Sequence, residues 1–161
     1  MAESVKTTDQ EVKVDREGKY LTFTLAKEEY GIGILKVKEI IGMMPITTVP
    51  RTPGFVKGVI NLRGKVIPVI DLRGRFNLER REHDKSTRII VVELRGTVVG
   101  FVVDAVREVL RIPRTVTEPP PAIAAGSGEK YITGVARLDD RLLMLLDLEK
   151  AVENDPLSDA V

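Results

Sequence analysis

Short apolar runs recur along most of the chain, and several alternate strictly with polar residues. In Leu21–Leu25 apolar residues alternate with threonines, which is the pattern of a half-buried β-strand. Three hairpins stand out, each with two apolar runs separated by a short turn, at residues 59–72, 89–104 and 131–146. Many short strands with turns at regular spacing predict small barrels or a sandwich. The segment 37–41 is too short to distinguish a strand from one helical turn.

Prolines and an aspartate mark places where these runs stop. Three prolines between residues 44 and 54 rule out regular strand pairing there. Pro68 lies inside a hairpin strand and predicts an edge position for it. Residues 147–152 predict a short helix, with Asp147 as its N-cap.

The apolar pattern occurs twice. Residues 20–41 align without gaps on residues 89–110 at an offset of 69, and residues 58–76 align on 134–152 at an offset of 76. A repeat of this length predicts two related units. Each unit is too small to bury a stable core alone, so we expect the two to share apolar surface. The identical pairs are Leu25/Leu94, Gly31/Gly100, Val37/Val106, Glu39/Glu108, Gly58/Gly134, Val59/Val135, Leu62/Leu138, Asp71/Asp147 and Leu72/Leu148.

The predicted division of the chain follows this repeat. We expect one folded region at 19–152 between two tails. Its predicted parts, in order, are a flexible tail (1–18), a first repeat unit (20–76), a charged link (77–88), a second repeat unit (89–152) and a C-terminal tail (153–161).

Composition narrows the function classes. Hydrophobic residues make up 43% and charged residues 30% of the chain, which is typical of a soluble globular protein. Twenty-five basic residues against 24 acidic ones give a net charge of +1, which argues against electrostatic binding to nucleic acid. Without cysteine, disulfides and thiolate metal sites are excluded. No apolar run is long enough to cross a membrane, and the polar N-terminus has no signal core, so we expect a cytoplasmic protein.

Candidate catalytic groups are few. His83 is the only histidine and lies in the charged link, where a solvated loop residue is expected rather than a metal ligand. Asp71, Asp104 and Asp147 each end an apolar strand, a position that favours a turn or helix cap over acid–base chemistry. These patterns predict a protein that is not an enzyme, needs no cofactor or metal and works through its surfaces.

Arginines cluster where the first repeat unit passes into the charged link. They are interleaved with Glu79, Glu82 and Asp84, so we interpret them as a mixed, solvated surface rather than a phosphate site. These arginines are Arg73, Arg75, Arg80 and Arg81.

Longer motifs connect the chain to a known family. The stretches YGIGILKVKEI at 30–40 and TPGFVKGVINLRGKVIPVIDLR at 52–73 resemble the CheW family, the adaptors that link bacterial chemoreceptors to the histidine kinase CheA. The stretches VVGFVVDAVREVL at 98–110 and YITGVARLDDRLLMLLDLEKA at 131–151 continue the resemblance, which covers 19–152.

The resemblance implies an all-β fold of two intertwined five-stranded SH3-like barrels with one or two short helices. It implies a scaffold that binds the regulatory domain of CheA and the cytoplasmic tip of a chemoreceptor, and further CheW copies in array rings. The proteins would then assemble at the inner face of the membrane, without a cofactor. An adaptor of a chemosensory pathway that controls surface motility or gene expression is the alternative.

The family motifs also imply site residues. A receptor tip is a helical hairpin, which would dock in an apolar groove between the barrels. Each residue also has a structural interpretation: the valines as core, the glycines as close backbone contacts and the arginine as a turn residue. The implied groove residues are Val37, Ile40, Gly100 and Val109, and the implied residues for kinase or receptor coupling are Gly58 and Arg63.

One hairpin departs from its repeat copy. Asp139 and Asp140 stand where the first unit has Arg63 and Gly64. We hypothesise that these oppositely charged tips serve opposite faces of the molecule. Two other function classes stay open: a nucleic-acid-binding barrel, which would show salt-dependent DNA retention, and an enzyme with a site at the seam, which would show turnover or bound metal.

Overall fold

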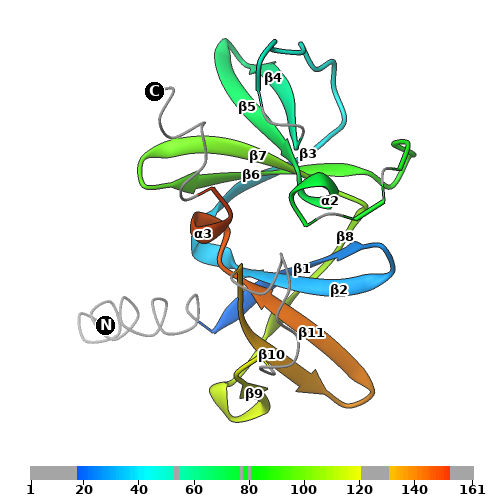
Figure 1. Ribbon diagram of the computed structural model, residues 1–161. Coiled ribbons are helices and arrows are strands. Elements are labelled where there is room, and N and C mark those ends of the chain that lie inside the picture. Colours follow the sequence, from blue (N-terminus) through cyan, green and yellow to red (C-terminus); the bar gives the residue numbers. More distant parts are fainter. Residues whose placement is uncertain (1–17, 53–54, 77, 80, 121–130, 153–161) are drawn as a thin grey trace, which may run out of the picture.

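The computed structural model describes residues 18–52, 55–76, 78–79, 81–120 and 131–152 (Figure 1). Apart from Gly18, the two predicted tails lie outside the described residues. Within them, strands dominate and the helical elements are short. The strands are β1 (Lys19–Leu25), β2 (Glu28–Gly33), β3 (Val37–Gly42), β4 (Val56–Leu62), β5 (Lys65–Asp71), β6 (Arg88–Leu94), β7 (Thr97–Val103), β8 (Ala105–Arg111), β9 (Thr117–Glu118), β10 (Ile132–Leu138) and β11 (Arg141–Leu146). The helical elements are the 3-10 turns η1 (Ile34–Lys36) and η2 (Arg114–Val116) and the helices α2 (Leu72–Arg75) and α3 (Leu148–Val152).

The repeat seen in the sequence sets the positions of these elements. β1 and β6 have bounds that differ by 69 residues at both ends, and those of β4 and β10 differ by 76. α2 and α3 follow β5 and β11 at corresponding places. Asp71 caps α2 by accepting a hydrogen bond from the backbone N of Arg73 (3.1 Å), and Asp147 caps α3 through the backbone N of Glu149 (3.0 Å). The predicted cap at Asp147 is therefore confirmed.

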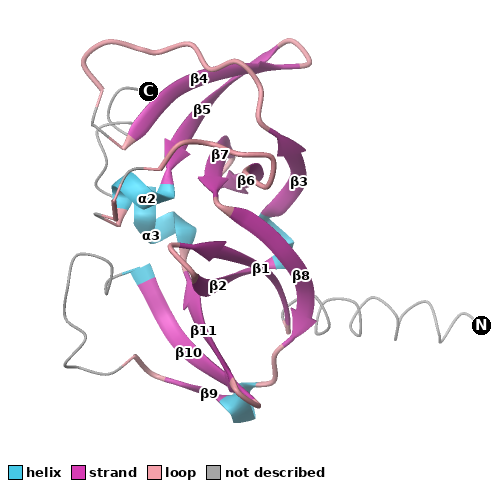
Figure 2. Ribbon diagram, turned by 90° about the vertical axis from the view of Figure 1, so that its right-hand side faces the viewer, coloured by secondary structure: helices cyan, strands magenta, loops and turns pink. Residues whose placement is uncertain are grey.

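The two repeat units exchange hairpins. One sheet has the order β3-β6-β7-β5-β4, and the other has the order β8-β1-β2-β11-β10-β9. We call the first barrel 1 and the second barrel 2. Barrel 1 takes its β6–β7 hairpin from the second unit, and barrel 2 takes its β1–β2 hairpin from the first (Figures 1 and 2). The expected pair of intertwined barrels is confirmed, with the two-residue β9 as a sixth strand in barrel 2.

Most of the core lies between the barrels. Its buried residues come from both sheets and both repeat units, and four aromatic rings cross it in contact: Phe23, Tyr30, Phe76 and Tyr131, with centroids 5.6 to 6.0 Å apart. Each barrel also has a smaller interior of its own, around Ile60 and Val91 in barrel 1 and around Leu143 in barrel 2. The expectation of shared apolar surface is therefore correct.

Two further findings refine the sequence analysis. β5 lies between β4 and β7, so the prediction of an edge strand from Pro68 is wrong for the strand as a whole. Parallel pairing with β7 begins only at Val69, so the missing N–H of Pro68 falls just outside that ladder. Among the described residues, no helix has the length and apolarity needed to cross a membrane.

Candidate partner-binding surface

β3 and β8 are the edge strands that the barrels leave open on one side. Each stands at the end of its sheet order, and each is the repeat copy of the other. Figure 2 shows them following one another along the same side of the molecule. Ile40 on β3 is 41% exposed and Val109 on β8 is 49% exposed, so each edge strand places one aliphatic side chain at the surface. These two predicted groove residues are thus at the surface, at equivalent places in the two barrels.

The other two predicted groove residues lie deeper. Val37 begins β3 and packs, partly buried, against the core between the barrels. Side chains alternate between the two faces of β3, so Val37 faces inward and Ile40, three residues on, faces outward. Gly100 is buried in the middle of β7, where an added Cβ would lie 2.8 Å from Cγ2 of Ile89. Val37 and Gly100 therefore support the strands beneath this surface, and a role in binding stays a prediction for all four.

Gly58 has a backbone role that no other residue type could fill. Its φ is +146°, and an added Cβ would lie 2.0 Å from the carbonyl oxygen of Thr47. The neighbouring Val59 exchanges both backbone hydrogen bonds with Thr47, each 2.8 Å long. Gly58 thus lets the segment after β3 return and close barrel 1 against β4.

Arg63 occupies the β4–β5 turn with a φ of +51°, and its side chain is 69% exposed. Its guanidinium donates a hydrogen bond to Glu39 on β3, so the turn contacts the edge strand. This hydrogen bond holds the pKa of Glu39 below its ordinary value. Gly64 is the second residue of the β4–β5 turn. The acidic β10–β11 turn lies at the opposite end of the molecule (Figures 1 and 2).

Barrel 2 contains a related but different contact. Glu108, the repeat copy of Glu39, lies 3.1 Å from a guanidinium nitrogen of Arg141. Arg141 also donates two hydrogen bonds to Glu29 on β2, at 3.1 and 2.6 Å. The side-chain hydrogen bond lowers the pKa of Glu29 although partial burial acts in the opposite direction. In both barrels an arginine of the hairpin thus holds the glutamate of the edge strand.

A partly buried ion pair joins two residues that the sequence pattern did not connect. Arg73, interpreted from its sequence context as a solvated cation, has a side chain only 11% exposed and pairs with Asp104, which is 10% exposed. Arg73 donates from Nε (2.8 Å) and Nη2 (2.7 Å) to the two carboxylate oxygens. Burial raises the pKa of Asp104, but hydrogen bonds from Arg73 and from the backbone N of Ala26 outweigh it, so that the pKa is lowered. The one signal in the sequence was Asp104 itself, an aspartate that ends an apolar strand and is followed by no predicted helix that it could cap.

His83 lies in a loop and is exposed, as predicted. Partial desolvation of its ring and the positive charge of nearby Lys57 lower its pKa. Among the described residues, no cluster of three or more histidine and carboxylate side chains is placed to hold a metal ion. Arg75 is not a free surface cation either, because its guanidinium lies 4.7 Å from the ring centre of Phe55 and 4.8 Å from that of Tyr131. Arg80 lies outside the described residues.

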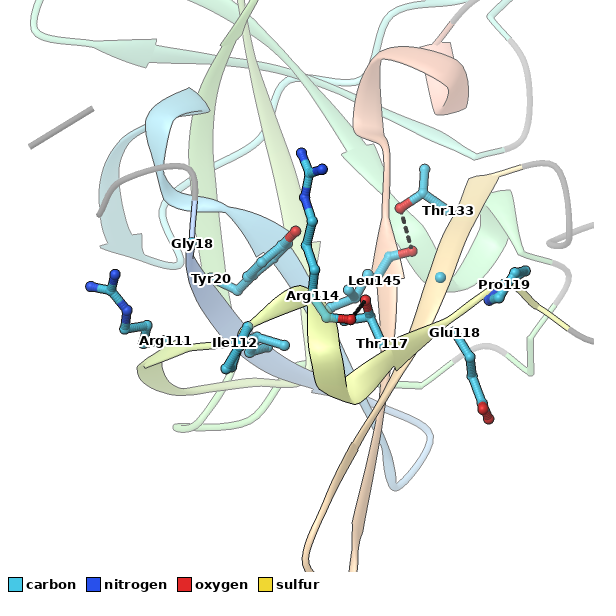
Figure 3. A pocket seen from close by; sticks show the side chains of 12 residues that line it. Gly18, Tyr20, Arg111, Ile112, Arg114, Thr117, Glu118, Pro119, Thr133 and Leu145 are labelled. Carbon is cyan, nitrogen blue, oxygen red and sulfur yellow. Dashed lines mark hydrogen bonds between the residues drawn. The ribbon is translucent and has the colours of Figure 1, made fainter. Parts of the chain in front are cut away.

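A hollow of about 850 Å³ opens at the end of barrel 2 (Figure 3). Tyr20, Ile112 and Leu145 form part of its wall, together with Arg114 of η2 and Thr133 of β10. None of the six predicted site residues lines it. Of the residues of β3 and β8, only Arg111, the last residue of β8, lines the hollow, which therefore lies away from Ile40 and Val109.

Comparison with known proteins gives a consistent result. The model of the CheW-like domain family matches residues 19–155. The chain is 42% identical over 139 residues to the chemotaxis protein CheW of Klebsiella aerogenes, covering 86% of this chain and 84% of that protein. It is 36% identical over 136 residues to the chemotaxis protein CheW of Helicobacter pylori, covering 84% and 82%.

A solved structure agrees with the sequence relatives. The scaffolding protein TtCheW of Thermoanaerobacter tengcongensis superposes with a TM-score of 0.78 at 41% identity, covering 85% of this chain and 93% of that one. The family match over most of the chain, the relatives and the shared fold lead to one conclusion: the chain belongs to the CheW family of chemotaxis scaffold proteins.

Proposed function

We propose that this chain is a non-enzymatic adaptor that couples the cytoplasmic tips of chemoreceptors to the regulatory domain of the histidine kinase CheA, in arrays at the inner face of the membrane. Family membership and the resemblance of its motifs support this function. The structural observation that carries it is the surface formed by the edge strands β3 and β8.

A helical receptor tip fits such a surface chemically. Ile40 on β3 and Val109 on β8 offer one exposed aliphatic side chain from each barrel, and the two strands follow one another along one side of the molecule (Figure 2). An amphipathic helix is held by apolar contacts of this kind, spaced along one face. A helix that contacts both residues spans both barrels, so its affinity depends on how the barrels are placed relative to each other.

The ends of the molecule suit other partners. Val66, beside the basic β4–β5 turn, is 71% exposed, and its repeat copy Leu142, beside the acidic β10–β11 turn, is 55% exposed. An exposed aliphatic residue next to charge is a common composition for a small protein interface. These ends are where the regulatory domain of CheA and further CheW copies would bind, away from the receptor tip. Each contact alone is small, so we expect weak binding by each one.

The test separates the two kinds of partner. We expect Ile40→Asp and Val109→Asp to abolish co-sedimentation with receptor-bearing membranes, because each places a charge in an apolar contact. Binding to the isolated regulatory domain of CheA should persist in both variants. Val66→Asp is the matched control, since it adds the same charge at an exposed aliphatic position on β5, outside β3 and β8. Equal sedimentation of the wild-type protein with receptor-free membranes would refute the proposal.

A further inference from the structure

Within the described residues, the chain passes between the two barrels at two places. The first is η1, which connects β2 of barrel 2 to β3 of barrel 1. The second is Asp104, the single residue between β7 of barrel 1 and β8 of barrel 2. The repeat offset of 69 takes Leu35 in the middle of η1 to Asp104, so the two crossings are copies of each other.

Asp104 contacts both barrels through one carboxylate. From barrel 1 it accepts two hydrogen bonds from Arg73 of α2, at 2.8 and 2.7 Å. From barrel 2 it accepts a hydrogen bond from the backbone N of Ala26 in the β1–β2 turn (2.9 Å). Its own backbone N donates to the carbonyl of Thr24 at the end of β1 (3.1 Å). Its side chain is therefore a direct link between the barrels.

The charged link is attached to the same carboxylate. The Nη1 of Arg81 lies 3.2 Å from the Oδ2 of Asp104. The Nη1 of Arg73 donates a hydrogen bond to the carbonyl oxygen of Glu79 at 2.6 Å. Arg81 is 48% exposed and also pairs with Asp84, so its contribution is screened by solvent. The pair of Arg73 and Asp104 is the buried part of this cluster.

The first crossing has no comparable contact. Leu35 is 52% exposed. The neighbouring Lys36 forms an ion pair with Glu149 of α3, but their side chains are 46% and 24% exposed. Exposed pairs of this kind hold geometry weakly, whereas a bidentate arginine–carboxylate pair in a buried position restricts both partners. Of the two crossings, the second therefore has the more restrictive polar contact, which adds to the apolar core that the barrels share.

We propose that Asp104 is a positioning residue, which, together with the shared apolar core, fixes the placement of the two barrels that a partner contacting both β3 and β8 requires. Asp104 touches neither Ile40 nor Val109 in this role. It acts through β8, which begins at the next residue and carries Val109. The part of this inference that concerns the receptor tip rests on the proposed function, whereas the part that concerns barrel placement does not.

The absence of cysteine from the chain makes barrel placement measurable. Lys65→Cys in barrel 1 and Asp140→Cys in barrel 2 give one exposed attachment point in each barrel for a pair of spin labels. We expect a narrow distance distribution by pulsed electron paramagnetic resonance in the otherwise wild-type protein. Asp104→Asn should broaden it, because the amide keeps the shape of the side chain but loses the charge that holds Arg73.

Three further variants complete the design. Arg73→Lys keeps the charge but loses the two-pronged geometry, so it should broaden the distribution less than Asp104→Asn. Glu149→Gln at the first crossing and Arg81→Gln in the link are controls that should leave the distribution unchanged. If Asp104→Asn does not fold, as judged by circular dichroism, Arg73→Lys decides the outcome. A distribution as narrow as wild type in the folded variant overturns the inference.

Binding then tests the consequence for the partner. A receptor-tip helical hairpin should bind unlabelled Asp104→Asn about tenfold more weakly, within the usual range for coupling between sites. The regulatory domain of CheA, which is proposed to bind at an end of the molecule, should bind it as tightly as wild type. An equal loss for both partners would indicate general destabilisation and count against positioning. If the wild-type protein binds no receptor tip, the proposed function fails, while the distance measurement still decides whether Asp104 positions the barrels.

Discussion

The two barrels have related strands but differently filled interiors. In barrel 1 the buried residues around Ile60 are covered by Met43, Met44 and Ile46 from the segment that follows β3. Among the described residues of barrel 2, fewer are buried around Leu143, and the hollow of about 850 Å³ opens beside them. The repeated parts of the sequence thus determine the strands, and the unrepeated connections determine how well each interior is filled. Residues related by the repeat should consequently differ in how they respond to the same substitution.

The largest difference is expected at Gly58 and its copy Gly134. An alanine Cβ at Gly58 would lie 2.0 Å from a backbone oxygen, at a φ of +146°, whereas at Gly134 the nearest atom, the carbonyl of Glu118, is 3.3 Å away. We expect Gly58→Ala to lower the free energy of unfolding by about 4 kcal/mol and Gly134→Ala by about 1 kcal/mol, from backbone strain and overpacking. Urea titration followed by circular dichroism measures both. Equal losses would show that barrel 1 is not closed around Gly58.

The two crossings should differ almost as much. Asp104→Asn leaves Arg73 buried without its carboxylate, so we expect a loss of about 3 kcal/mol near neutral pH. Glu149→Gln at the other crossing removes a more exposed partner and should cost under about 1 kcal/mol.

The same comparison can be made against pH. The pKa of Asp104 is lowered in the folded protein, so its stabilising effect is present above the ordinary aspartate pKa of about 3.9 and is lost as the pH falls through the folded-state value. We expect the free energy of unfolding to fall less steeply in Asp104→Asn than in the wild type as the pH is lowered into the acid range. Urea titrations at a series of pH values measure both curves. Parallel curves for the variant and the wild type would contradict this assignment.

A smaller difference is expected at Gly100 and its copy Gly31. A Cβ at Gly100 would lie 2.8 Å from Cγ2 of Ile89, a stiff branched side chain, while at Gly31 it would lie 3.2 Å from Cδ2 of Leu145. We expect Gly100→Ala to cost about 2 kcal/mol and Gly31→Ala under about 1 kcal/mol. Thermal unfolding of both variants provides the check. A larger loss at Gly31 would mean that barrel 2 is the more tightly packed of the two.

The smallest effect on stability is expected at the hairpin tips. Arg63→Glu and Asp139→Arg reverse the charge of exposed turn residues, so urea midpoints should stay close to wild type. Because the turns lie at opposite ends, we expect each variant to lose a different partner in separate pull-downs with the regulatory domain of CheA and with a second copy of this chain. Loss of the same partner in both variants would reject the idea of two separate faces.

The sequence predicts a feature of this structure well when the residues that form it are close together along the chain. The hairpins, the cap at Asp147 and the short helix that follows it were predicted from neighbouring residues, and the structure has them. The order of strand pairing joins β1 to β8 and β5 to β7, which no local pattern specifies. The prediction of intertwined barrels therefore came from the family resemblance and not from the periodicity of the sequence.

The same limit applies to the candidate surface. The residue types of Ile40 and Val109 do not show whether these side chains lie at the surface or in the core. Arg73 was assigned to the solvated surface because charged neighbours surround it in the chain. Its buried partner Asp104 is 31 residues away, so only the folded structure shows the pair.

The exchange of hairpins also has a kinetic consequence. β1 cannot join its neighbour β8 until more than half of the chain has been made, and the core between the barrels needs both repeat units at once. Contacts between residues so far apart in the sequence slow folding, because the entropy of closing long loops is lost before the contacts form. The protein should therefore fold late and as a whole rather than one barrel after the other, and half-made chains would expose apolar strand edges during synthesis.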